Sequence, residues 1–225
     1  MTPKICVSIK PKNNDDALSL IEKVEVTKAD FIEIRLDNYK TPKFTDLVAS
    51  TKIPLIATNK LPCEMGSFTG TATQRWQNLM DAANSGFQYV DLELTSLMLK
   101  EHIIDLKKLN TKAIVSSHNF NGAFTVVELQ RILDKESDMG ADVCKIVGTA
   151  IQAQDNLDVL NFVSENSNKT QLVCFCMGEQ GRISRLLSPA FGAFFTFATL
   201  KQGSETAPGQ ISINEMRTAY SLLRQ

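Results

Sequence analysis

Residues 113–147 read AIVSSHNFNGAFTVVELQRILDKESDMGADVCKIV, and this stretch decides the fold. It begins and ends with short runs rich in β-branched residues, 113–116 and 143–147, which are typical of strands. Between these runs, apolar residues recur at the spacing of an amphipathic helix. They are Val127, Leu129, Ile132 and Leu133. The stretch therefore predicts a strand, a covering helix and a second strand parallel to the first.

The helix of this unit carries its own start and stop signals. Thr125, followed three residues later by Glu128, has the form of a capping box, and Gly140 is a C-terminal stop. The same alternation extends in both directions and gives eight strand-like runs, at residues 5–9, 31–36, 54–57, 89–94, 113–116, 143–147, 172–176 and 193–197. Eight such repeats in 225 residues predict an α/β fold, a (β/α)8 barrel of the TIM type, rather than a doubly wound sheet. The sequence also lacks the G-x-G-x-x-G fingerprint of dinucleotide-binding sheets.

Composition and charge narrow the classes of function. The chain has 24 Lys plus Arg and 25 Asp plus Glu, so it lacks the basic excess of proteins that bind nucleic acid or membrane surfaces. No linker or low-complexity tract divides it, which predicts one domain over 1–225. The N-terminus enters a strand-like run without a signal-peptide core, and the longest apolar stretch, near 192–198, is too short to span a bilayer. We expect a cytoplasmic enzyme with a small-molecule ligand.

The cysteines are not expected to bind metal. Five cysteines are scattered through apolar runs, which is typical of buried reduced thiols rather than a disulfide framework. Cys174 and Cys176 share a face of one predicted strand, where core packing is favoured over a metal site. No zinc-like histidine spacing or calcium loop occurs, so neither a metal nor a cofactor is expected.

Charged residues occur inside strands that a barrel should bury on both faces. Glu33, Arg35 and Asp37 alternate along one strand and so project to one side, and Asp91 and Glu93 repeat this pattern on another. Two acidic strands need a cationic partner. Such residues either form a buried ion-pair network without chemistry or line an active site at the open end of the barrel.

Lys145 is the best nucleophile candidate. It lies in an apolar strand, where it must either face the lumen or pair with a carboxylate such as Glu93. Desolvation disfavours the charged form of a lysine, which leaves neutral amine able to attack a carbonyl. His118 follows the preceding strand, at the level where barrel enzymes keep their active sites. His102, by contrast, is expected on an exposed helix face.

These residues stand in segments that together resemble the type I 3-dehydroquinate dehydratase family, in order along nearly the whole chain. The segments are residues 33–37, 91–94, 116–120, 143–146, 177–185 and 206–210. The resemblance implies the dehydration of 3-dehydroquinate to 3-dehydroshikimate, the third step of the shikimate pathway to chorismate and aromatic amino acids. It implies that Lys145 forms a Schiff base with the substrate, that His118 is the general acid and base, and that Glu93 orients His118.

The resemblance also implies the remaining contacts with the substrate. Glu33 and Arg35 would line the polyol site, and Arg185 would hold the carboxylate. The ring would be enclosed by Phe197, Met177, Thr206, Ala207 and Gln210. The loop 201–209, rich in small and polar residues, is a candidate lid. A homodimer is expected, although the residues themselves do not set the oligomeric state.

The sequence departs from the family pattern at three places. Lys60 stands where the family usually carries Arg, and is expected to contact the ligand or to pair with Glu33. Glu64-Met65-Gly66 replaces an acidic residue followed by two glycines, and Thr206 replaces a usual Ser.

Two other functions compete with this interpretation. A class I aldolase also uses a barrel lysine, but often needs a phosphate site, and no clear phosphate loop is visible. A non-catalytic barrel that binds a small carboxylate or serves as an oligomer scaffold would be favoured if Lys60 marks a decayed site.

Overall fold

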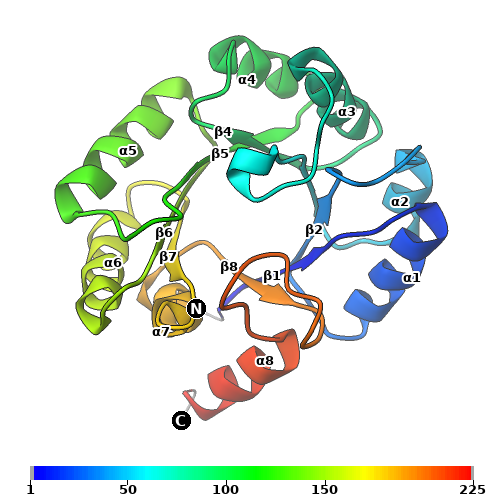
Figure 1. Ribbon diagram of the computed structural model, residues 1–225. Coiled ribbons are helices and arrows are strands. Elements are labelled where there is room, and N and C mark those ends of the chain that lie inside the picture. The colour runs from blue at the N-terminus through cyan, green and yellow to red at the C-terminus, as the bar shows by residue number, and fades with distance from the viewer. Residues whose placement is uncertain (1–2, 224–225) are drawn as a thin grey trace.

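The structure is a computed structural model and describes residues 3–223. Strands and helices alternate along the chain and are arranged around a central axis (Figure 1). Eight strands pair in parallel in the order β7-β6-β5-β4-β3-β2-β1-β8. They are β1 (Ile5–Ile9), β2 (Phe31–Arg35), β3 (Leu55–Thr58), β4 (Tyr89–Glu93), β5 (Lys112–His118), β6 (Val143–Thr149), β7 (Leu172–Met177) and β8 (Thr196–Thr199). This is the predicted (β/α)8 barrel.

The barrel is joined least tightly between its two end strands. Residues 3–223 contain no strand ladder between β7 and β8, but the Phe194 N–H donates to the Leu172 carbonyl at 2.8 Å just before β8 begins. One backbone hydrogen bond therefore links the two edges, and the rings of Phe175 on β7 and Phe197 on β8 lie 6.3 Å apart across the seam, measured between centroids.

Helices cover the outside of the barrel, and the capping box predicted at Thr125 is present. Capping boxes are present at Thr71, Thr125 and Ser212, and Gly140 ends its helix in the left-handed conformation. The helices are α1 (Asn14–Glu25), α2 (Phe44–Ser50), α3 (Ala72–Asn84), α4 (Leu99–Lys108), α5 (Val126–Met139), α6 (Ala153–Asn166), α7 (Arg182–Leu187) and α8 (Ile213–Leu222), with 3-10 turns η1 (Pro62–Glu64) and η2 (Ser188–Phe191).

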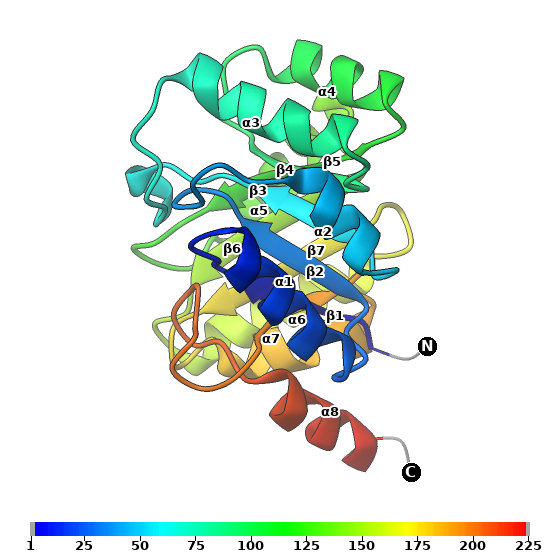
Figure 2. The same ribbon diagram turned by 90° about the vertical axis from the view of Figure 1, so that its right-hand side faces the viewer.

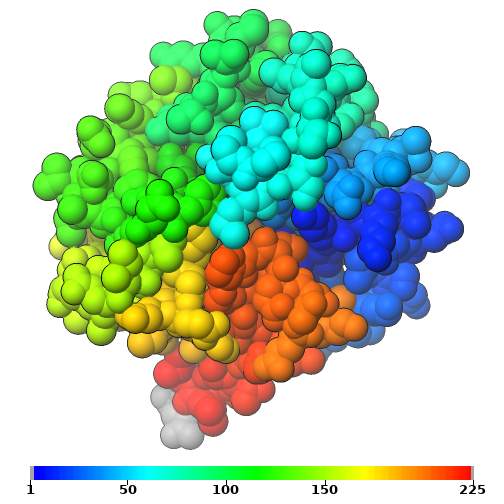
Figure 3. Space-filling view, in the orientation of Figure 1, coloured from blue at the N-terminus to red at the C-terminus, as the bar shows by residue number. Residues whose placement is uncertain are grey.

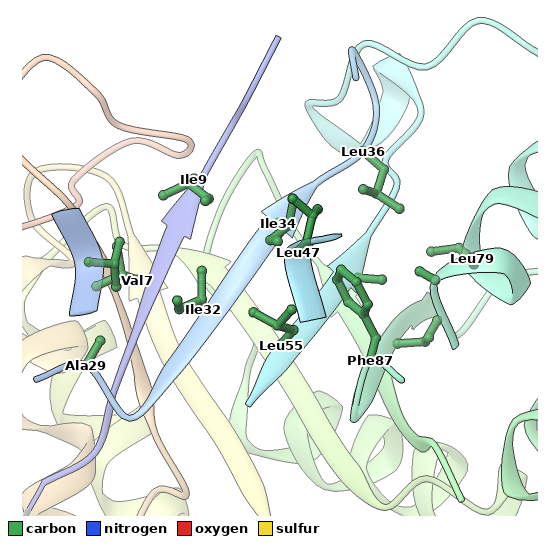
Figure 4. Close-up of a cluster of buried hydrophobic side chains, with 14 of the residues drawn as sticks. Val7, Ile9, Ala29, Ile32, Ile34, Leu36, Leu47, Leu55, Leu79 and Phe87 are labelled. Carbon is green, nitrogen blue, oxygen red and sulfur yellow. The ribbon is translucent and has the colours of Figure 1, made fainter. Parts of the chain in front are cut away.

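The apolar core lies in two layers. Outward-facing strand residues such as Ile32, Ile34 and Leu55 pack against helix residues such as Leu47 (Figure 4). Inside the barrel, aromatic rings fill the end where the strands begin: Phe31 lies 5.7 Å from Tyr89 and 4.8 Å from Phe195, measured between ring centroids. The lumen is apolar at that end, and its charged residues lie at the other.

The structure corrects two details of the sequence analysis. The last strand begins at Thr196, not at residue 193. Phe194 and Phe195, just before it in the chain, belong to the aromatic cluster that fills the end of the barrel where the strands begin. Cys63 is exposed on η1, whereas the other four cysteines are buried and Cys174 and Cys176 pack in the core as predicted. Within residues 3–223, no helix is long and apolar enough to cross a membrane.

Candidate active site

A pocket opens at the end of the barrel where the strands finish, and it brings together eleven of the twelve predicted site residues. The remaining one, Glu93, lies behind the pocket wall and lines a neighbouring cavity. The predicted residues that line the pocket are Glu33, Arg35, Lys60, His118, Lys145, Met177, Arg185, Phe197, Thr206, Ala207 and Gln210.

Lys145 projects from β6 into the centre of this pocket. Its Nζ donates to Asp91 Oδ2 at 2.8 Å, lies 3.8 Å from Glu33 Oε1, and sits 4.4 Å above the centroid of the Phe197 ring. The side chain is only 7% exposed. The amine is therefore held between two carboxylates and an aromatic face, and its partner is Asp91 rather than Glu93.

Asp91 is shared between two lysines. Its Oδ2 accepts from Lys145, while its Oδ1 accepts from Lys60 Nζ at 2.7 Å and from Ser116 Oγ at 2.7 Å. Burial alone would raise the pKa of Asp91, but the two ammonium groups lower it well below its usual value. Asp91 is a fully charged bridge at neutral pH. Its alternation with Glu93 marked it as a buried charge, but the resemblance gave it no role in the site.

Lys60 does not pair with Glu33. Its Nζ contacts Asp91 and Glu93 Oε1, the latter at 2.9 Å. Burial would lower the pKa of Lys60, but the two carboxylates raise it well above its usual value. Glu33 instead accepts from Thr58 Oγ1 at 2.9 Å and from Ser8 Oγ.

His118 is oriented by Glu64, not by Glu93 as expected. Its Nδ1 lies 3.0 Å from Glu64 Oε2, and its ring stacks on Phe120 with 5.7 Å between centroids. Glu93 Oε2 instead accepts from Arg75 Nη1 at 2.7 Å and from Ser96 Oγ at 3.1 Å. Burial lowers the pKa of His118, and the hydrogen bond with Glu64 only partly offsets this, so the neutral ring is favoured at neutral pH.

Arg185 supplies the free positive charge of the pocket. Within residues 3–223 it has no carboxylate partner: Nη2 donates to the Pro208 carbonyl at 3.2 Å, the guanidinium lies 4.4 Å from the Phe175 ring, and Nε has no acceptor. Burial lowers its pKa, although a guanidinium stays charged at neutral pH. A buried cation without a counter-ion fits an anionic ligand.

Arg35 belongs to a second pair at the mouth. Its Nε donates to Asp37 Oδ1 at 2.7 Å, as their alternation on one strand predicted. His102, expected on an exposed face, is half-buried and stacks on Trp76 with 3.8 Å between ring centroids.

Two loops far apart in sequence meet over the pocket. The segment around η1 (cyan) and the loop 201–209 (orange) come together near the centre of the face in Figure 3, and both lie on the same side of the barrel in Figure 2. Thr206 Oγ1 donates to Ser8 Oγ at 2.8 Å, and the Gly178 N–H donates to the Pro208 carbonyl at 3.3 Å. Gly209 has a φ of +73°, and a Cβ there would lie 2.2 Å from the Gly178 carbonyl oxygen, so this contact needs glycine.

Comparison with known proteins agrees with this geometry. A family model described as "Type I 3-dehydroquinase" matches residues 5–225. The chain belongs to this family. The 3-dehydroquinate dehydratase of Desulfotalea psychrophila is 34% identical over 221 residues, with 97% of each chain covered, and that of Methanococcus maripaludis strain C7 is 29% identical, with 97% and 99% covered. The family, fold and enzyme class predicted from the sequence are therefore confirmed.

A solved structure of the family has nearly the same fold. The type I 3-dehydroquinate dehydratase of Clostridium difficile, solved with covalently modified comenic acid, superposes with a TM-score of 0.90 at 28% identity, and the match covers 99% of this chain and 92% of that one. The structural resemblance therefore extends over the whole barrel.

Proposed function

We propose that this protein dehydrates 3-dehydroquinate to 3-dehydroshikimate through a Schiff base on Lys145. The observation that carries the proposal is one pocket that holds a buried amine, a histidine and an arginine that has no counter-ion among residues 3–223. The ligand that these groups suit is a ketone that also bears a carboxylate. Arg185 binds that carboxylate, and the ketone carbon then faces Lys145.

Imine formation comes first. The Lys145 nitrogen attacks the ketone carbon once its ammonium has given up a proton. Two of the three ammonium protons end on the former ketone oxygen, which leaves the carbinolamine as water, and the nitrogen of the resulting iminium keeps the third proton. The iminium carries the positive charge that the Lys145 ammonium carried. Asp91 and Glu33 stabilise it as they stabilise the ammonium, so the covalent intermediate adds no unpaired charge to the buried site.

Elimination follows at the neighbouring carbons. The iminium withdraws electrons and acidifies the adjacent C–H, whose proton passes to the neutral His118 ring. The electron pair moves through the enamine and expels the β-hydroxyl, which takes a proton from the protonated His118 and leaves as water. Hydrolysis of the conjugated iminium then releases the enone product and restores the Lys145 amine. His118 therefore acts first as base and then as acid.

An absorbance assay tests the function. Addition of 3-dehydroquinate should produce the ultraviolet absorbance of a conjugated enone, because elimination places a double bond beside the ketone. A class I aldolase would cleave a C–C bond and form no such product, and a non-catalytic barrel would change nothing. Absence of the enone signal from folded protein would exclude the proposal.

Glu64 gives a prediction about pH. Because its hydrogen bond raises the pKa of His118, Glu64→Gln should lower that pKa and move the acidic limb of kcat/KM to lower pH, with kcat about 10-fold lower since the ring is less firmly oriented. The profile of kcat/KM from pH 4.5 to 8 measures this. Glu179→Gln, which removes an exposed acid with 81% of its side chain accessible, is the matched control and should leave the limb in place. A limb that moves upward in Glu64→Gln would contradict the role.

The loop 201–209 is proposed as a lid that orders over bound ligand. Its contacts with Ser8 and Gly178 hold it next to Arg185, where closure would exclude water from the iminium. Tryptic cleavage after Lys201 should slow when the substrate is trapped on Lys145 by borohydride, whereas cleavage after the exposed Lys52 should not change. Equal cleavage after Lys201 with and without trapped ligand would leave the loop an ordinary connection.

The expected homodimer and cytoplasmic location stay predictions. Sedimentation velocity at several protein concentrations would test the first, and cell fractionation the second.

A further inference from the structure

A line of alternating charges leads from the outer helix layer to Lys145. Arg75 Nη1 donates to Glu93 Oε2 at 2.7 Å, and Glu93 Oε1 lies 2.9 Å from Lys60 Nζ. Lys60 Nζ donates to Asp91 Oδ1 at 2.7 Å, and Asp91 Oδ2 accepts from Lys145 Nζ at 2.8 Å. Glu93 and Asp91 thus each use one oxygen for each of their two neighbouring cations. Removing the charge of Arg75 at one end of this line therefore changes how strongly Asp91 holds Lys145 at the other end.

Arg75 is firmly placed although it lies outside the pocket. It stands in the first turn of α3, whose N-terminus is fixed by the capping box of Thr71 and Gln74. Besides Glu93, its guanidinium donates to the Asn59 carbonyl at 3.1 Å and to Ser96 Oγ at 3.3 Å, and only 13% of the side chain is exposed. A side chain bonded at three points acts as a fixed charge rather than a mobile one.

We propose that Arg75 is a positioning residue that sets the pH range in which the Lys145 amine can react, acting through Glu93, Lys60 and Asp91. The inference rests on the proposed function, in which Lys145 is the nucleophile, and it adds a residue that never touches the substrate.

The physical reason is competition for Lys60. Arg75 neutralises one side of Glu93, which leaves Lys60 free to share its charge with Asp91. Without the Arg75 charge, Glu93 has Lys60 as its main cation and draws it away from Asp91. Asp91 then depends more on Lys145 and holds it more strongly as an ammonium. A charge in a buried network is poorly screened, so the effect reaches the amine.

Other titratable groups face the same residues and are left unchanged in the test. Around Lys145 these are Glu33 on β2, Glu136 on α5, His118 on β5 and the thiol of Cys6 on β1. Around Arg75 they are Glu64 beside the same cavity and His102 on α4. None of them hydrogen-bonds to Arg75, so a change at Arg75 acts first on Glu93.

The experiment follows the reactivity of the Lys145 amine without any substrate. Reductive methylation with formaldehyde and cyanoborohydride, measured at Lys145 by peptide mass spectrometry and normalised to the exposed Lys23, gives a rate at each pH. In Arg75→Gln the midpoint of this profile should rise by about half to one pH unit, so that labelling on the neutral side slows about 3- to 10-fold. Arg75→Lys keeps the charge and should restore most of the wild-type midpoint.

Paired variants separate charge from structure. Glu93→Gln should lower the midpoint, and Arg75→Gln combined with Glu93→Gln should return it to within about 0.3 unit of wild type, because both charges of the pair are gone. Arg131→Gln, an exposed change of equal charge on α5, should leave it unmoved. A wild-type midpoint in Arg75→Gln, or a shift that persists in full in the double variant, would overturn the inference.

The two proposals can fail separately. If wild-type protein makes no enone, the proposed function fails, and the labelling midpoints still decide what Arg75 does. If Arg75→Gln does not fold by circular dichroism, the single variant Glu93→Gln decides it: a midpoint equal to wild type there would overturn the inference.

Discussion

Borohydride added together with 3-dehydroquinate is expected to inactivate the protein irreversibly and to leave the ligand on Lys145. Reduction converts the iminium into a secondary amine that water cannot hydrolyse, so the adduct is permanent. Lys145 is favoured because its Nζ faces the pocket beside Phe197, whereas the other buried amine, Lys60, is engaged by Asp91, Glu93 and Ser116. Intact mass and peptide mapping measure the adduct. A ligand found on Lys60 would contradict the assignment of Lys145 as the nucleophile.

Lys145→Ala completes this test. The variant should form no adduct and lose turnover entirely, because the other lysine of the pocket, Lys60, stays paired with Asp91 and Glu93. Asp91 keeps Lys60 and Ser116 as partners, so the barrel should remain folded by circular dichroism. Lys112→Ala is the matched control: it removes a strand lysine at the beginning of β5, remote from the pocket, and should leave both adduct and turnover intact.

The barrel was predictable because its signals are local. Strand-like runs, helical spacing and the caps at Thr125 and Gly140 each lie within a few residues, and the alternation of strand and helix then allows few topologies. The position of β8 was the exception. The apolar residues that fill the bottom of the barrel run directly into those of β8 in the sequence. Phe195 is distinguished from the strand residues by its packing against Phe31, which the sequence does not reveal.

The pocket residues were also predictable, but apart from the pairing of Arg35 with Asp37 their partners were not. Alternation on β4 puts Asp91 and Glu93 on the same side, and both do contact Lys60. Glu93, however, lies next to α3 and pairs with Arg75, while Glu64 reaches His118 from η1, 54 residues away in the chain. Such pairings depend on side-chain length and on how loops fold over the mouth, which sequence spacing does not encode. The one available signal was that Glu64 keeps the acidic residue of the family pattern, although Met65 replaces the glycine that usually follows it.

His118→Ala is expected to separate the two halves of the reaction. The variant keeps Lys145, Asp91 and Arg185, so it should still form the imine and still be trapped by borohydride. Elimination needs a group that takes the proton and returns one to the leaving hydroxyl, and its loss should lower kcat by about 10² to 10⁴. Single-turnover mass spectrometry of the trapped species measures the first step, and enone absorbance measures the second.

The control for this variant is His102→Ala, which removes the other histidine from its stack on Trp76, outside the pocket. It should retain near wild-type kcat, because half-burial on α4 gives it a packing role only. A His118→Ala protein that eliminates at the wild-type rate would assign the proton transfer to another group. The outcome that supports the role is specific: undiminished adduct on Lys145, with the unreduced imine accumulating because the base that takes the neighbouring proton has been removed.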